Sequence, residues 1–243
     1  MTNFVKTEWR TMNKDENTIV KMKAVPIEGT SNARLIGFDK IQLSGVFLEI
    51  GTYTGHDYHY TPNTLIIDRT IIDDKEYIIT EIQSCSFSHC SDVECIIIGA
   101  CVERIDWNMY KCSKLQSIIV KDENKVYHDI DGVLFKGNEL IAFPQGRIGS
   151  YIVPYGTKSI GNHAFKSAKI EHIVLPNTLE EIGDNAFYEC HNLKEIVLPQ
   201  SIKRVKANYN VNRRPIQQRF YLSNDCDKNN PYSIIDITKI FPA

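Results

Sequence analysis

Residues 179–199 read LEEIGDNAFYECHNLKEIVLP, and three other stretches repeat this pattern with small changes. They are ITEIQSCSFSHCSDVECIII (79–98), VERIDWNMYKCSKLQSIIV (102–120) and KSIGNHAFKSAKIEHIVLP (158–176). In each stretch an isoleucine is followed five residues later by an aromatic residue, then by a polar turn and a run of branched aliphatic residues. A unit this short cannot bury its apolar side alone, so it must stack on its neighbours.

The period of the repeat indicates the architecture. Ile82 to Ile105 is 23 residues, Ile160 to Ile182 is 22, and Ile182 to Val205 is 23, within the window of roughly 20–29 residues that leucine-rich repeats use. We therefore expect a β-rich, right-handed leucine-rich repeat solenoid with short turns rather than long helices on its convex side. The aromatic residues that keep the same phase should stack as a spine: Phe87, Tyr110, Phe165 and Phe187.

Two signatures in this chain resemble those of one known family. The pattern I-G-x-x-A-F-x-x-C-x-x-L-x-x-I-x-L-P occurs at residues 182–199. Residues 124–165 contain a Tyr, an Asp-Gly-Val-Leu hairpin, and then a Pro and a Tyr-x-Val-Pro strand between two repeats. Over about residues 65–205 the sequence is similar to the BspA-type leucine-rich repeat family. The resemblance implies a repeat solenoid and the adhesin role common in that family, the binding of host or matrix proteins at a cell surface.

The repeat divides the chain into three segments. Residues 1–60 alternate in short apolar and polar runs without repeat phase, and we interpret them as a β-rich cap over the first coil. The solenoid is expected over residues 61–206, with a hairpin insertion at 131–144. Residues 207–243 are predicted to form a C-terminal capping tail, whose apolar run SIIDITKIF packs on the last coil.

Composition limits the environment in which the chain works. A formal net charge of −2 gives no global reason to expect a nucleic acid or a membrane as partner. No apolar run approaches the roughly 18 residues that a spanning helix needs. The first residues, MTNFVKTEWRTMNKDENTIV, are charged throughout and lack the apolar stretch of a secretory signal. These features favour a cytoplasmic location, with the cell surface as the alternative if a signal was removed.

Alternation along the strands predicts which side chains point outward. In LKEIVLP, Leu193, Ile196 and Leu198 point inward if Val197 points outward. The outward row of β-branched residues in successive units is then Ile97, Ile119, Ile152, Val174 and Val197. This row has two interpretations: β-branched residues suit any strand, whereas an exposed apolar stripe beside charges is typical of a partner-binding patch. The flanking outward residues assigned to the same patch are Glu171, His172, Lys194 and Glu195.

Motifs of catalysis are missing from the sequence. It contains neither G-x-S-x-G nor H-E-x-x-H, and the segment GRIG at 146–149 lacks the later Gly and the Lys of a phosphate-binding loop. Repeat solenoids also present ridges rather than deep pockets. We therefore predict a non-enzymatic protein with no cofactor.

Cysteines and histidines offer two weak metal-site candidates. Cys85, His89, Cys90, Cys95 and Cys101 lie close together in the sequence, but without the short paired spacing that zinc sites prefer. The repeat gives Cys90, Cys112 and Cys190 a common slot, filled by Ala168 in another unit, which indicates small, buried and reduced packing residues. The second candidate, His56-Asp57-Tyr58-His59, reads as a polar loop, so no metal site is predicted.

Basic residues gather near the end of the repeats, where residues 203–219 contain no Asp or Glu. The cations are Lys203, Arg204, Lys206, Arg213, Arg214 and Arg219. Such a cluster can attract anionic partners, although most charge runs are simply solvated. The main functional prediction is therefore an intracellular, scaffold-like protein–protein interaction module. The alternative is a cell-surface adhesin, and a more remote one is anion or nucleic-acid binding through 203–219.

Overall fold

The computed structural model describes most of the repeat region and parts of both ends of the chain. The described residues are 6–10, 19–38, 64–72, 75–83, 86–87, 90–107, 112–193, 195–206 and 219–221. The chain forms two compact units, residues 1–134 (unit 1) and 135–243 (unit 2). Strands and turns make up the regular structure of the described residues, which contain no helix.

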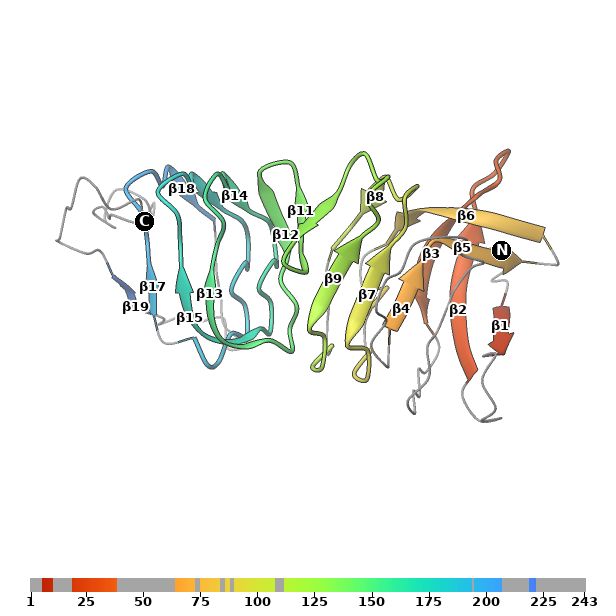
Figure 1. The fold of residues 1–243 in the computed structure, drawn as a ribbon, viewed down its shortest axis with the longest axis horizontal. Coiled ribbons are helices and arrows are strands. Elements are labelled where there is room, and N and C mark those ends of the chain that lie inside the picture. Colours follow the sequence, from red (N-terminus) through yellow and green to blue (C-terminus); the bar gives the residue numbers. More distant parts are fainter. Residues whose placement is uncertain are drawn as a thin grey trace. The chain divides into compact units, whose positions relative to one another are not determined.

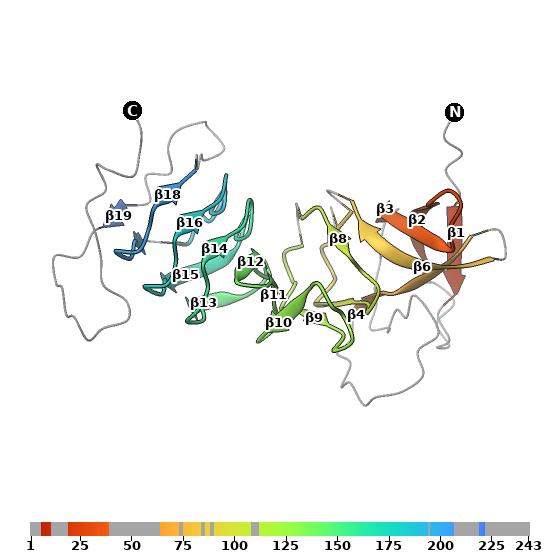
Figure 2. The same cartoon turned by 90° about the horizontal axis from the view of Figure 1, so that it is seen from above.

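Unit 2 is a stack of coils, each of which contributes one strand to each of two parallel sheets. The first sheet continues through β12 (Glu139–Ala142), β14 (Ser159–Ile160), β16 (Glu181–Ile182) and β18 (Arg204–Val205). The second has the order β13 (Ile148–Ile152), β15 (Lys169–Val174), β17 (Glu195–Val197) and β19 (Arg219–Tyr221). Figures 1 and 2 show the successive strands of both sheets side by side. This is the β-rich repeat architecture that the period predicts.

Unit 1 combines coils of the same kind with an antiparallel edge. Its larger sheet has the order β1-β2-β3-β6-β5, with β8 also paired to β6, and its smaller sheet has the order β4-β7-β9. The strands are β1 (Lys6–Arg10), β2 (Ile19–Pro26), β3 (Asn32–Phe38), β4 (Thr64–Ile67), β5 (Arg69–Ile72), β6 (Lys75–Ile82), β7 (Cys95–Ile98), β8 (Arg104–Ile105) and β9 (Ser117–Val120). Pairing is antiparallel for β1-β2-β3 and for β5-β6, and parallel for β3-β6-β8 and for β4-β7-β9.

A run of short strands joined by tight turns interrupts the coils. β10 (His128–Ile130), β11 (Val133–Lys136) and β12 are consecutive neighbours in one sheet, and the boundary between the two units falls within β11. Asp131 and Gly132, between β10 and β11, have φ values of 50° and 67°. Positive φ at two consecutive residues is the signature of a type I′ hairpin turn, which Asp-Gly favours.

The pairing register carries the repeat beyond the segment with the clear sequence pattern. Leu35 pairs with Ile82, and Ile82 with Ile105, so Leu35 occupies the phase position of an earlier coil. At the other end Ile196 pairs with Phe220, so β19 occupies the strand position of a further coil. The remaining parts of the predicted caps lie outside the described residues. The right-handed sense of the solenoid stays a prediction.

Stacked aromatic rings fill the core of unit 2. The rings of Phe165 and Phe187 are stacked with centroids 5.1 Å apart, and Phe143 stacks on Phe165 at 4.9 Å. All three side chains are buried. The predicted spine is therefore present here, and Phe143 extends it by one coil. In unit 1, Phe87 packs against Trp107 at 5.4 Å, and Tyr110 lies outside the described residues.

Candidate protein-binding surface

An apolar stripe lies on the outer face of the second sheet of unit 2. β13 pairs with β15 in a register that sets Ile152 beside Val174, and these side chains are 61% and 38% exposed. Ile148, at the other end of β13, is 74% exposed. Ile173 pairs with Ile196, so the half-buried Val197 follows Val174 on β17. We call Ile148, Ile152, Val174 and Val197 the unit 2 stripe.

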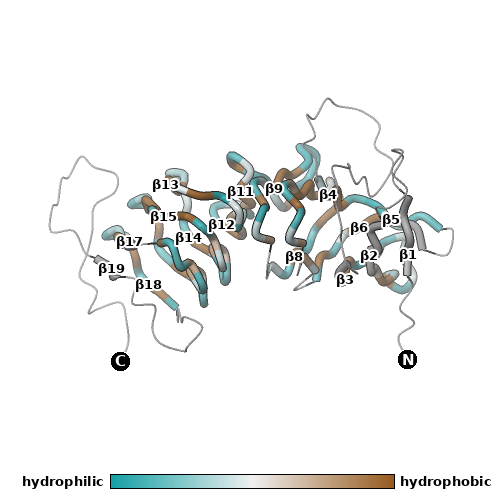
Figure 3. The backbone as a smooth tube through the Cα atoms, turned by 90° about the horizontal axis from the view of Figure 1, so that it is seen from below, coloured by the Kyte–Doolittle hydropathy of each residue, from teal (hydrophilic) through white to brown (hydrophobic). Residues whose placement is uncertain are grey.

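The same outward position is covered in unit 1. Ile97 is only 4% exposed and forms a cluster with Ile66 and Cys95, against which the half-buried Ile119 packs. β4, β7 and β9 set Ile66, Ile97 and Ile119 side by side within this cluster. The predicted exposure is therefore wrong for Ile97 and only partly met at Ile119, because a small second apolar cluster has formed on this face. Figure 3 shows hydrophobic residues on the strands of both units and mostly hydrophilic turns between them.

The flanking residues assigned to the patch are only partly described. His172 is exposed on β15, where it pairs with Ser150, and the neighbouring Glu171 is half-buried. Lys194 lies outside the described residues. Glu195 is in β17, but its side chain is not described. Of the predicted site, the structure thus brings together Ile152, Val174, Val197, Glu171 and His172 on β13, β15 and β17. The sequence analysis missed Ile148, which lies outside the repeated pattern but shares strand parity with Ile152.

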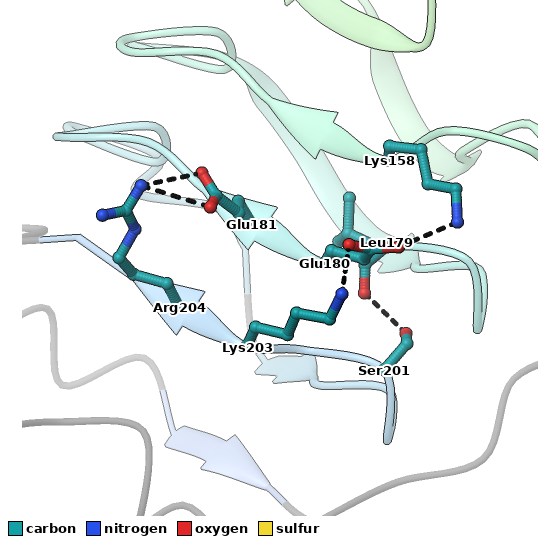
Figure 4. Close-up of polar contacts among 7 residues, drawn as sticks. All are labelled: Lys158, Leu179, Glu180, Glu181, Ser201, Lys203 and Arg204. Carbon is teal, nitrogen blue, oxygen red and sulfur yellow. Dashed lines mark hydrogen bonds and ion pairs between the residues drawn. The ribbon is translucent and has the colours of Figure 1, made fainter.

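Charged residues of successive coils pair across the first sheet of unit 2. Glu180 accepts hydrogen bonds from Lys158 of the preceding coil at 2.9 Å and from Lys203 of the following coil at 2.7 Å (Figure 4). The hydrogen bonds from Lys203 and Lys158 lower the pKa of Glu180 to about 2. Figure 4 also shows Arg204 donating two hydrogen bonds of 3.2 Å to the carboxylate of Glu181.

These ion pairs between successive coils change the interpretation of the basic segment 203–219. Lys203 and Arg204 are paired with carboxylates, and Lys206 lies 3.9 Å from Asp184. The acidic partners belong to the preceding coil, so a count along the segment itself shows only the cations. Arg213 and Arg214 lie outside the described residues, and the side chain of Arg219 is not described. Three of the six cations thus have acidic partners in the preceding coil, which weakens the case for the segment as an anion site.

Cysteines of the common slot are packing residues. Cys112 donates a hydrogen bond from its Sγ to the carbonyl oxygen of Phe87 at 2.9 Å, and Cys190 does the same to Phe165 at 2.8 Å. Cys90, Cys112, Cys190 and Ala168 are all buried. Burial raises the pKa of Cys190 to about 12, so its thiol stays protonated. The small buried slot predicted from the repeat is confirmed.

No group of three or more His, Cys, Asp or Glu side chains among the described residues has an arrangement that could hold a metal ion. Cys85 and His89, and the whole 56–59 loop, lie outside that part of the chain. Cys95 lies with Ile66 and Ile97 in the outer cluster of unit 1. Nor do the described residues contain a helix with the length and apolar character that crossing a bilayer requires.

Comparison with known families identifies the repeat. The family model described as BspA type leucine rich repeat region matches residues 69–143 and 139–227, in six copies. The chain belongs to this family. The match includes β19, in agreement with the further coil seen in the register, and it begins downstream of β3. Membership of the BspA type leucine-rich repeat family suggests a protein-interaction or surface-adhesin type of role, and such repeats are typically binding modules rather than enzymes.

Solved structures of other leucine-rich repeat proteins are similar to this BspA type chain. The pneumococcal vaccine antigen PcpA is 16% identical, with a TM-score of 0.36, over 83% of this chain and 72% of that chain. A leucine-rich repeat protein from Bacteroides ovatus is 19% identical, with a TM-score of 0.42, over 78% and 51%. A leucine rich cell surface protein from Faecalibacterium prausnitzii is 15% identical, with a TM-score of 0.36, over 82% and 86%. No curated protein matches the chain.

Proposed function

We propose that this chain is a non-enzymatic protein-binding module whose contact surface is the outer face of β13, β15 and β17. The observation that carries the proposal is the unit 2 stripe, in which the exposed Ile152 and Val174 lie side by side on β13 and β15, with the exposed Ile148 at the other end of β13. Isolated exposed aliphatic residues are common on protein surfaces, whereas contiguous ones mark contact sites. Tyr155, just after β13 and 69% exposed, adds an aromatic side chain of the kind enriched at interfaces.

The repeat makes this face well suited to binding. Neighbouring strands lie about 4.8 Å apart, so equivalent side chains of successive coils form a straight row. A hydrogen-bonded sheet is already ordered before it meets a partner, so little backbone entropy is lost on association. His172 and Glu171 on β15 provide polar groups beside the apolar row, as at the rim of an interface. The surface therefore combines an apolar centre with a polar margin.

The cellular setting separates two forms of this function. An intracellular scaffold would meet its partner in the cytoplasm, whereas a cell-surface adhesin would meet a host or matrix protein outside. The family match supports the second form. Protease treatment of intact cells distinguishes them, because digestion of this chain without cell lysis requires surface exposure.

The test replaces the stripe without changing the strand pattern. Ile148→Thr, Ile152→Thr and Val174→Thr keep β-branched side chains but remove apolar surface. The control is Ile130→Thr, since Ile130 is 39% exposed on β10 of unit 1 and is not part of the stripe. Proteins captured by wild type from lysate and from surface extracts are identified by mass spectrometry, and the affinity of each purified candidate is then measured by calorimetry.

A loss of about 1 kcal/mol for each substituted contact predicts an affinity roughly 100-fold weaker for the triple variant. The control should bind like wild type. Equal affinity of the folded triple variant for every captured partner, or an equal loss in Ile130→Thr, contradicts the assignment of this surface.

A further inference from the structure

Two cysteines of unit 1 occupy the same place in successive coils. Cys90 and Cys112 are separated by the same interval as Cys95 of β7 and Ser117 of β9, which pair in register. Both side chains are fully buried, and both are thiols in the structure. Stacked coils bring equivalent positions to about 4.8 Å, within the range of about 4.4–6.8 Å between Cα atoms that a disulfide needs.

A single carbonyl oxygen anchors both residues. The backbone N–H of Cys90 donates to the carbonyl oxygen of Phe87 at 3.4 Å, and the Sγ of Cys112 donates to the same oxygen at 2.9 Å. The side chains of Cys90 and Cys112 are also hydrogen-bonded to each other, and this contact together with burial raises the pKa of Cys90 well above its usual range. The two sulfur atoms therefore lie next to each other in the core, across the junction of two coils.

We propose that Cys90 and Cys112 form a redox-sensitive staple, closing to an inter-coil disulfide when a small hydroperoxide reaches them. The sulfur of one cysteine attacks a peroxide oxygen, so that an S–O bond forms, the O–O bond breaks and one water leaves. The second sulfur then displaces the hydroxyl group of this sulfenic acid, so that the S–S bond forms, the S–O bond breaks and a second water leaves. Two thiols are oxidised and one hydrogen peroxide is reduced to two waters.

The setting predicts how this reaction behaves. Hydrogen peroxide, little larger than water, needs only a local opening of the coil, whereas a bulky disulfide oxidant needs a wide one. The thiolate is the reactive form, and the raised pKa of Cys90 keeps it scarce. Oxidation should therefore be slow at neutral pH and faster in alkaline solution. The exposed Cys101 should react first and serves as an internal marker of oxidant exposure.

Unit 2 contains an equivalent pair of positions in which alanine replaces one of the two cysteines. The backbone N–H of Ala168 donates to the carbonyl oxygen of Phe165 at 2.9 Å, and the Sγ of Cys190 donates to the same oxygen at 2.8 Å. This is the arrangement of Cys90 and Cys112 with alanine in the first position. Ala168 shows that the slot accepts alanine, so Cys112→Ala should fold, and Ala168→Cys should create a second oxidisable pair.

The test treats the folded full chain with hydrogen peroxide, removes the oxidant with catalase, and then denatures, alkylates and digests the protein with trypsin. Cys90 falls in the peptide 76–104 and Cys112 in the peptide 112–114, so the staple appears as a link between them, two hydrogen masses below the reduced pair. Fragmentation of the linked peptide then assigns the bond to Cys90 among the four cysteines of 76–104. Closing a loop of this size should raise the melting temperature by about 5–10 °C, reversibly with dithiothreitol.

The variants decide the assignment. Cys112→Ala should show neither the link nor the shift in melting temperature, and Ala168→Cys should gain a link to Cys190. The proposal is overturned if Cys90 pairs with Cys85, Cys95 or Cys101 instead. It is equally overturned if Cys90 and Cys112 are both still alkylated after Cys101 has been fully oxidised.

Discussion

The ring of Phe165 lies on the ring of Phe187, with centroids 5.1 Å apart and planes inclined by 18°. Both side chains are completely buried, and they come from the same position of successive coils, one repeat period apart. Phe143 continues the stack on the other side of Phe165. Since each ring packs on the ring of the next coil, the core of unit 2 depends on all of them together.

Phe187→Ala should therefore lower the free energy of unfolding by about 3–5 kcal/mol, because it opens a cavity in a stack that cannot collapse without moving a whole coil. Phe187→Leu fills more of the space and should cost clearly less. Urea denaturation followed by circular dichroism measures both. An alanine variant as stable as wild type would show that the stack does not support the core.

Gly183 lies where two coils approach closely in unit 2. A Cβ atom there would meet Oδ1 of Asn162 at 2.6 Å and the backbone nitrogen of Asn162 at 2.7 Å. At Gly161 the nearest atoms, Oε1 of Glu139 and the carbonyl oxygen of Leu140, would be 3.2 Å away. Gly183→Ala should thus cost about 1–3 kcal/mol, and more than Gly161→Ala. Thermal unfolding of the two variants tests this order, and the reverse order would contradict it.

The repeat period was sufficient to predict the coils that show it, but not the earlier coil that contains Leu35. Ile160, Ile182 and Val205 pair in register as their spacing by one repeat period requires. The earlier coil, to which Leu35 and Leu65 belong, was not predicted from the sequence. The interval between these two residues is much longer than the interval between their partners in the next coil, Ile82 and Ile96. A long insertion between two strands removes the periodicity without removing the pairing.

The candidate surface was harder to predict than the fold. Alternation along a strand identifies outward residues, but it says nothing about whether something covers them, and so Ile97 and Ile152 looked equivalent. Phe143 escaped notice because it follows its phase residue Leu140 by three positions rather than five. The pairs of Lys203 and Arg204 were missed because their partners lie one coil away. A search for opposite charges at the repeat period would have found them.

Asn124 organises a buried turn in unit 1 and satisfies its whole side chain there. Its Nδ2 donates to the carbonyl oxygens of Gly99 and Val102 at 2.8 and 3.0 Å, and its Oδ1 accepts from the backbone N–H groups of Val126 and Tyr127 at 2.9 and 2.8 Å. Asn124→Ala leaves these buried groups without that partner and should cost about 2–4 kcal/mol.

The control for Asn124 is Asn138→Ala, because Asn138 is exposed in the turn between β11 and β12. Its substitution should change the free energy of unfolding by no more than about 0.5 kcal/mol. Guanidinium denaturation at neutral pH compares the two variants. Equal stabilities would mean that water or neighbouring groups replace the amide without loss.

Glu180 links three coils, and its ionisation should make the stability of unit 2 depend on pH. Its pKa is about 2 in the folded chain, below the ordinary value of 4.5, because Lys203 and Lys158 donate hydrogen bonds to its carboxylate. A carboxyl group with a lowered folded pKa stabilises the fold above its ordinary pKa, and this contribution disappears as the pH falls through the folded value. Wild type should therefore exceed Glu180→Gln in stability at about pH 6, and the difference should shrink between about pH 4.5 and 2.

High salt should weaken the same difference, since these side chains are partly exposed. Denaturation curves of both proteins across this pH range measure it, and a difference that stays constant throughout would show that the ion pairs do not stabilise the coils.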